Sequence, residues 1–267
     1  MYVQTLMVMP SDTACTGEIK IKALLDYLQD IAGLAVQDLE GSPGELIGRG
    51  YAWVLLRYEV DVVSRMPAMD ERFQVRTWHA TEDGFHTLRA FELDNLSGTP
   101  LVRAKTSWVL IDLAAARPVR AGQRLPEIFS LDALPIAADF REIPRPSGGP
   151  FHERHFHVRF HDLDANEHVN NAVYFEWAYE ATPLDLLGYG MREMRAEFRV
   201  SARLGDTIAV RAEELEPADS GTESRLKAYA YTMLDAAGRE KRPLARLYAA
   251  WEPLDGFRSA ARGGASS

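Results

Sequence analysis

Cysteine, long apolar runs and positive charge are all scarce in this chain. Of 267 residues only Cys15 is a cysteine, so neither an internal disulfide nor a cysteine-rich metal site is available. A single thiol fits a reducing cytoplasm, which is the location we expect. No stretch approaches the ~18 to 20 uninterrupted apolar residues of a membrane helix, and residues 1–10 have no basic region typical of a signal peptide. We therefore expect no membrane insertion.

Basic residues are outnumbered, because 30 Lys and Arg stand against 39 Asp and Glu, for a net charge of −9. Nucleic-acid phosphates require a basic face, so nucleic acid is not an expected partner. The arginines that could form a local basic patch lie in two short series, Arg192, Arg195, Arg199, Arg203 and Arg117, Arg120, Arg124. Each series is either a solvated face or a docking patch for an acidic protein.

The hydrophobic content of 46% is that of a globular protein, and its pattern repeats. In the first half we expect a strand at 2–9, a helix at Ile19–Leu39, and strands at Tyr51–Val63, Glu71–Ala80, Phe85–Asp94 and Leu101–Leu113. In the second half we expect a strand at His155–Phe160, a helix at Val169–Thr182, and strands at Met194–Ala202, Thr207–Leu215, Ser224–Leu234 and Leu244–Trp251. Aligning Ala23 with Ala172, an offset of 149 residues, places the predicted helix and long strands of the two halves at roughly corresponding positions.

This order predicts an α+β fold, the tandem hotdog, in which each repeat wraps a curved antiparallel sheet around a long central helix. Joining the two sheets edge to edge would hide strand edges that otherwise invite aggregation. We expect an N-terminal repeat at 1–140, a Pro- and Arg-rich linker within 114–150, a C-terminal repeat at 150–255 and a disordered tail at 256–267. Because one chain supplies a hotdog pair, a homodimer is an open alternative to a monomer.

The segment before the second helix carries the clearest chemistry. Asp164, Asn166 and His168 alternate, so an extended backbone would direct their side chains to the same side. The helix that follows begins with free N–H groups, which can stabilise an oxyanion. A carboxylate and an imidazole can handle a water molecule and its proton. Asp and Asn also cap helices, so spacing alone leaves capping and catalysis both open.

Longer motifs in both halves help to decide between helix capping and catalysis. The run from Asp164 to Glu180 fits D-x-N-x-H-V-N-N-x-x-Y-x-x-W-x-x-E, and the first half contains Trp53-Val-Leu-Leu-Arg, Met66-Pro, Thr77-Trp and Arg103-Ala-Lys-Thr-Ser-Trp-Val. Together these runs resemble the acyl-acyl carrier protein (acyl-ACP) thioesterases of plants and bacteria over most of residues 13 to 253.

The resemblance implies a hydrolase that releases free fatty acid from acyl-ACP without a cofactor or a metal. It implies an acyl chain bound mainly in the N-terminal repeat and a reaction run from the C-terminal one. Position by position, it assigns Asp164, Asn166 and His168 as the catalytic group, with His168 as the base or proton relay, Asn166 orienting the carbonyl or the water, and Asp164 orienting the imidazole. Which residue is the direct base stays open.

Supporting positions follow from the same resemblance. Asn170, Asn171 and Glu180 match the motif and are expected to fix the helix in place. Ser201 marks a departure, because plant members carry a Glu-Cys pair where this chain has Ser201 and Ala202 in Glu197-Phe-Arg-Val-Ser-Ala-Arg. A carboxylate or thiol at that position is therefore absent.

Other features have simpler explanations. His155 and His157 share one face of a predicted strand, but thioester hydrolysis of this kind requires no metal, and we expect none there. Cys15 has no histidine near it in sequence and is expected to be inert. Tryptophans in strands are more typical of core than of an acyl pocket, and the predicted strands hold Trp53, Trp78 and Trp108.

Three further functions remain as alternatives. A hotdog hydrolase acting on acyl-coenzyme A would differ only in the carrier of the acyl chain. A non-catalytic acyl-thioester binding protein is motivated by the missing carboxylate at Ser201. A dehydratase of the same fold is less favoured, since the N-x-H-V-N-N run does not resemble that group.

Overall fold

The computed structural model describes residues 1–37, 43–81, 84–125, 136–137, 139–215, 226–238 and 242–254. The predicted tail at 256–267 lies outside these residues. The first half comprises β1 (Tyr2–Met7), α1 (Ile21–Leu34), α2 (Pro43–Gly48), β2 (Tyr51–Val62), β3 (Arg72–Thr81), β4 (His86–Asn95), β5 (Pro100–Asp112), β6 (Arg117–Val119) and α3 (Ala121–Arg124). The second half comprises β7 (His152–His157), α5 (Asn171–Ala181), β8 (Tyr189–Phe198), β9 (Thr207–Leu215), β10 (Lys227–Asp235) and β11 (Ala245–Pro253). Short 3-10 helices occupy Pro10–Asp12, Phe160–Asp162 and Leu186–Gly188.

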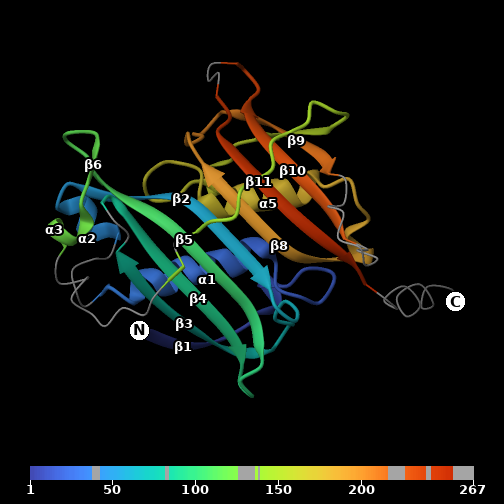
Figure 1. Ribbon diagram of the computed structural model, residues 1–267, viewed down its shortest axis with the longest axis horizontal. Helices are drawn as coiled ribbons and strands as arrows, with labels where there is room; N and C mark the ends of the chain where they lie inside the picture. The colour runs from blue at the N-terminus through green and yellow to red at the C-terminus, as the bar shows by residue number, and fades with distance from the viewer. Residues whose placement is uncertain are drawn as a thin grey trace, which may run out of the picture.

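One antiparallel sheet runs through both halves (Figure 1). Its strand order is β1-β3-β4-β5-β2-β8-β11-β10-β9-β7, with β6 added beside β5. At the centre, β2 pairs with β8 and places Tyr58 opposite Ala196 and Val60 opposite Met194. The second half therefore repeats the strand order of the first in reverse, as an approximate two-fold axis between β2 and β8 requires.

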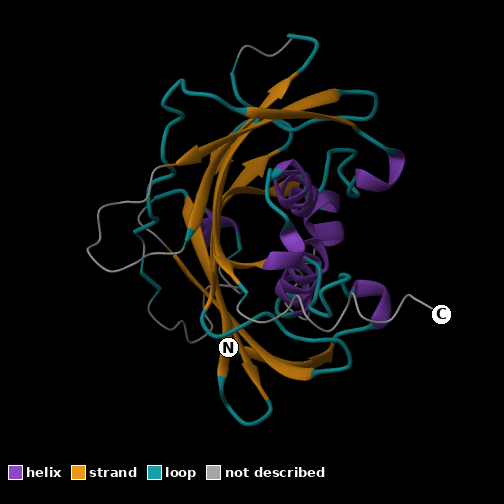
Figure 2. Ribbon diagram, turned by 90° about the vertical axis from the view of Figure 1, so that its right-hand side faces the viewer, coloured by secondary structure: helices purple, strands orange, loops and turns teal. Residues whose placement is uncertain are grey.

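The two long helices lie side by side on the concave face of this sheet, which curves around them (Figure 2). Leu24, Leu25, Leu28 and Ile31 of α1 are fully buried, at the three- and four-residue steps of an amphipathic helix. The predicted α+β tandem hotdog is confirmed. The first helix, however, ends at Leu34 rather than Leu39.

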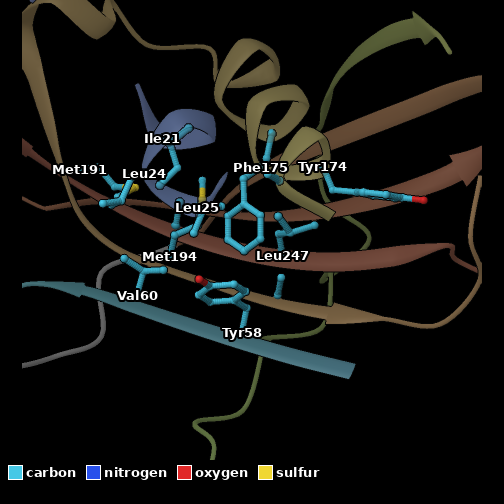
Figure 3. Close-up of a cluster of buried hydrophobic side chains, with 14 of the residues drawn as sticks. Ile21, Leu24, Leu25, Tyr58, Val60, Tyr174, Phe175, Met191, Met194 and Leu247 are labelled. Atoms are coloured by element: carbon cyan, nitrogen blue, oxygen red, sulfur yellow. The ribbon is translucent and has the colours of Figure 1, made fainter. Parts of the chain in front are cut away.

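The core is continuous across the two halves. Tyr58 of β2 meets Phe175 of α5 edge to face, with ring centroids 5.5 Å apart, and Leu25 of α1 and Met194 of β8 pack around the same contact (Figure 3). Because β2 and α5 belong to different halves, this packing fixes the start of α5 relative to the first half's strands.

The repeat is more regular than the sequence predicts. Pro10 and Phe160 open equivalent 3-10 helices, and the bridge between Thr13 and Ile19 recurs between Leu163 and Val169. These pairs are 150 residues apart, so the predicted offset of 149 was one residue short.

Two predicted strands were misplaced. The strand predicted at Met194–Ala202 is β8 at Tyr189–Phe198, and the strand predicted at His155–Phe160 is β7 at His152–His157. In both cases the sheet pairing begins earlier, because Tyr189 pairs with the end of β11 and His152 pairs with β9. The residues after each strand form the loops that surround the start of α5.

Candidate active site

A cavity of about 720 Å³ lies between α1 and the inner face of strands β2 to β5. Most of its lining belongs to the first half, but a segment of the second half completes it. That segment contributes His161, Leu163, Asp164, Ala165, Asn166, Asn170 and Asn171. Ala165 and Asn166 are exposed to solvent as well as lining the cavity, so this segment lies at the mouth.

The segment 164–168 is a tight turn, and the extended backbone expected from the alternation was wrong. The Asp164 amide donates to the His168 carbonyl at 2.8 Å, and Glu167 adopts a left-handed φ of 60°. The Asp164 Oδ1 accepts from the Asn166 amide at 2.8 Å and from the His168 amide at 3.4 Å. The carboxylate therefore shapes its own loop, in the manner of an Asx turn.

The start of α5 adds donors beside this loop. Asn170 is the N-cap, and its Oδ1 accepts from the Ala172 amide at 2.9 Å and from Gln29 Nε2 of α1 at 3.4 Å. Among the described residues, the Asn171 amide makes no hydrogen bond. A first-turn amide carries the partial positive charge of the helix end and can receive an anionic oxygen.

His168 is held close to the cavity but does not line it. Its side chain is half-buried, and within the described part of the chain the imidazole makes no hydrogen bond. The next residue, Val169, donates its amide to the Ala202 carbonyl at 3.0 Å. The structure thus gathers Asp164, Asn166, Asn170 and Asn171 at the cavity and leaves His168 outside its lining.

The two remaining predicted residues lie apart from the cavity lining. Glu180 is in the last turn of α5, where its exposed carboxylate lies 4.0 Å from Arg154. Ser201 is exposed in the loop after β8, next to Ala202, which anchors Val169. The place of the family's Glu-Cys pair is therefore beside the 164–168 turn.

Tyr174 of α5 contacts the loop after β8. Its hydroxyl accepts from the Ala202 amide at 2.9 Å, while burial raises its pKa to about 12.

The equivalent turn in the first half does not carry the same set of residue types. The Ala14 amide donates to the Glu18 carbonyl at 2.8 Å, which reproduces the Asp164 to His168 contact 150 residues earlier. Ala14, Thr16 and Glu18 therefore occupy the places of Asp164, Asn166 and His168. The fold has two such turns, but only the second carries a carboxylate, an amide and an imidazole.

A polar wall inside the cavity was not predicted from the sequence. Thr87 and Arg89 of β4 and Thr106 of β5 line it, although β4 was assigned only as a strand. The signal was available in the strand alternation, because Thr87 and Arg89 fall on the same face as the buried Phe91.

The remaining candidate residues lie partly inside and partly outside the cavity lining. Trp53 and Trp108 line the cavity, contrary to the expectation of plain core, whereas Trp78 does not. Cys15 is exposed and outside the cavity. In the described part of the chain, no group of three or more His, Cys, Asp or Glu side chains is placed to hold a metal ion, and no helix there is long and apolar enough to cross a membrane.

The joined sheet, the paired helices and the cavity completed by the loop before α5 define a protein of the tandem hotdog class. Residues 1–129 match the acyl-ACP thioesterase N-terminal domain and residues 149–243 match the acyl-ACP thioesterase C-terminal domain. The chain therefore belongs to the acyl-ACP thioesterase family.

Individual relatives are distant. A palmitoyl-acyl carrier protein thioesterase of Cuphea hookeriana is 30% identical over 183 residues, and an acyl-acyl carrier protein hydrolase of Cuphea viscosissima is 29% identical over 182 residues. Each alignment covers 62% of this chain but 43% of the relative, so the chain matches less than half the length of these proteins.

Solved structures share the whole fold. A 12:0-ACP thioesterase from Umbellularia californica superposes with a TM-score of 0.80 at 17% identity, covering 95% of this chain and 94% of that one. An acyl-ACP thioesterase from Bacteroides thetaiotaomicron superposes with a TM-score of 0.76 at 21% identity, covering 94% and 97%. At such identities the likeness establishes the fold alone.

Proposed function

We propose that this protein hydrolyses the thioester between an acyl chain and acyl carrier protein and releases the free acid. The observation that carries the proposal is the cavity of the first half, whose mouth is formed by the 164–171 segment of the second half. This arrangement supports an N-terminal repeat at 1–140 that binds the chain and a C-terminal repeat at 150–255 that supplies the reacting groups.

In the proposed reaction, water adds to the thioester carbonyl, the carbonyl oxygen becomes an oxyanion, and the carrier thiolate leaves. The Asn171 amide and the Asn166 side chain at the mouth are the candidate donors to the oxyanion. Asp164 lines the cavity and His168 does not, which favours the carboxylate as the group that takes the proton from water. His168 then relays a proton to the departing thiolate. Neither step requires a metal or a cofactor.

The acidic carrier protein needs a basic surface on this acidic chain. In the described residues, Arg117, Arg120 and Arg124 have no carboxylate within ion-pair distance, and Arg120 lies over the ring of Phe85. The other predicted series is largely neutralised, since its members pair with glutamates: Arg192 with Glu252, Arg195 with Glu193 and Arg199 with Glu197. We therefore assign the carrier protein to the surface around β6 and α3.

Charge reversal tests this assignment. Arg120→Glu combined with Arg124→Glu should raise KM for acyl-ACP several-fold, because each lost contact weakens electrostatic docking. The same variant should leave hydrolysis of a short acyl-pantetheine unchanged, and Arg192→Glu serves as the matched control on the paired series. An equal effect on both substrates would show that Arg120 and Arg124 do not dock the carrier protein.

A comparison of two carriers tests the proposed acyl-ACP hydrolase against two alternatives, an acyl-coenzyme A hydrolase and a non-catalytic binding protein. The same acyl chain is presented on acyl carrier protein and on coenzyme A, and kcat/KM is measured for each. A clear preference for the coenzyme A form overturns the carrier assignment. Tight binding of both without turnover would identify a binding protein, the alternative favoured by Ser201 and Ala202 in place of the family's Glu-Cys pair.

A further inference from the structure

The inner wall of the cavity carries a buried positive charge that has no counter-charge among the described residues. Arg89 of β4 is 9% exposed and lines the cavity. In the described part of the chain its guanidinium donates to Thr77 Oγ1 at 3.3 Å and has no carboxylate within ion-pair distance. Burial lowers its pKa to about 10, so the group is still charged at neutral pH.

Arginines on the opposite face of the same sheet are treated differently. Arg76 lies 2.7 Å from Glu92 and 2.5 Å from Asp94, and Arg103 lies 2.8 Å from Asp94. These outward arginines are more exposed than Arg89, yet they are paired. Because Arg76 and Arg103 are paired, the lack of an ion-pair partner is not a general feature of arginines in this sheet. A buried charge without a partner is also costly.

Two hydroxyls share the wall with Arg89. Thr87, two residues earlier on the same face of β4, and Tyr58 of β2 are both buried and line the cavity. Among the described residues, neither hydroxyl oxygen has a hydrogen-bond partner. Since an arginine has five N–H donors, the wall offers several hydrogen bonds that a plain alkyl chain would leave unmade.

The opposite wall of the cavity, formed by α1, also carries charged side chains, but none of those described forms an ion pair with Arg89. Lys22 and Asp26 of α1 form an ion pair at 2.6 Å, and Asp30, one helical turn further, has its pKa raised by burial and by Asp26. Arg89 has neither carboxylate within ion-pair distance. The isolated donors are therefore those of the sheet wall.

From this wall we infer that the cavity binds an acyl chain bearing an oxygen function of its own, a carboxylate, hydroxyl or keto oxygen that accepts hydrogen bonds from Arg89. Thr87 and Tyr58 lie in the same wall as secondary donors. The inference rests on the proposed function for the identity of the ligand as an acyl chain, and it narrows that ligand from fatty acids in general to oxygenated ones.

The test is a binding measurement that does not depend on catalysis. Isothermal titration compares straight-chain acids from octanoic to tetradecanoic acid with dicarboxylic and terminally hydroxylated acids of the same lengths, each with its C1 carboxyl blocked as the N-methyl amide so that no head-group carboxylate can bind Arg89. The full chain should bind the best oxygenated acid about 10- to 100-fold more tightly than its plain counterpart, the range of a single hydrogen bond to a charged group. The relative affinities of the dicarboxylic and hydroxylated acids distinguish an anionic acceptor from a neutral one.

Variants attribute the preference to the wall. Arg89→Met should abolish the preference, and Thr87→Val should reduce it without removing the buried arginine. Arg72→Met, an exposed arginine on the neighbouring β3, is the matched control and should retain it. Thermal unfolding of each variant establishes that it folds, and if Arg89→Met does not, Thr87→Val carries the test.

The inference about oxygenated acyl chains and the proposed hydrolase function can fail independently of each other. Tighter binding of plain acids, no binding of any acid, or a preference that survives in both wall variants would overturn the inference. A preference for oxygenated acids without release of acid from any thioester would support the inference and overturn the hydrolase.

Discussion

Replacing Asp164 by Asn and, separately, by Ala distinguishes two roles of one carboxylate. The Asp164 Oδ1 accepts from the Asn166 amide at 2.8 Å and more weakly from the His168 amide at 3.4 Å. Asn keeps an oxygen that can accept both bonds but removes the charge and the basicity. Ala removes the acceptor as well, so the turn loses its internal support.

The expected magnitudes differ between stability and rate. A hydrogen bond to a charged group contributes about 1.5 to 3 kcal/mol, so Asp164→Ala should lower the free energy of unfolding by about 2 kcal/mol and Tm by about 4 to 8 °C. Asp164→Asn should cost less than about 1 kcal/mol, because the contacts persist as neutral ones. If the carboxylate activates water, both variants lose on the order of 10² to 10⁴ in kcat.

Thermal unfolding and single-turnover hydrolysis of an acyl-ACP, measured on both variants, give the two readouts. A loss of rate in Asp164→Asn with nearly unchanged Tm would establish a chemical role for the charge. Wild-type turnover in Asp164→Asn would refute it, and would reduce Asp164 to a residue that shapes the loop.

Three further predictions concern stability and the inert thiol. Asn170→Ala should lower the free energy of unfolding by about 1 kcal/mol through loss of the α5 cap, and Asn170→Ser should recover most of it; chemical denaturation measures both, and equal stability of all three proteins would argue against the cap. Cys15→Ser should keep full acyl-ACP hydrolysis, because Cys15 is exposed outside the cavity; a large loss would make the thiol a participant. A hydrogen bond from Arg65 lowers the pKa of Glu71 below its usual 4.5. The resulting stability is present above pH 4.5 and is lost as pH falls further, so between about pH 5 and 3 the wild type should lose more stability than Glu71→Gln, by less than about 1 kcal/mol for this partly exposed pair; parallel acid titrations of unfolding would contradict this.

Periodicity predicted the architecture because helix and strand burial follow regular steps. Leu24, Leu28 and Ile31 show the helical step, and all three are buried in α1. Strand boundaries were less predictable, since the limits of β8 depend on its partners β2 and β11 rather than on its own residues. Pairing across the sheet is a property of distant segments, which one stretch of sequence does not contain.

The conformation of the 164–168 segment was not predicted from the sequence, and the catalytic role of its residues stays a prediction. Alternation suggested an extended Asp164 to His168 segment, whereas backbone bonds to Asp164 close it into a turn. That turn directs Asp164 and Asn166 to the cavity without His168. The polar wall around Arg89 escaped notice because a charged residue in a strand ordinarily faces solvent, and only the assembled sheet shows which face is inward.

Release of free acid from carrier-bound substrate tests the central claim most directly. The purified full chain is incubated with a mixture of acyl chains on acyl carrier protein, and mass spectrometry follows free acids and free carrier thiol together. We predict that both accumulate in equal amounts, and that Asp164→Asn slows their release by at least ~100-fold. No release by the wild-type protein, or equal release by the Asp164→Asn variant, would contradict this prediction.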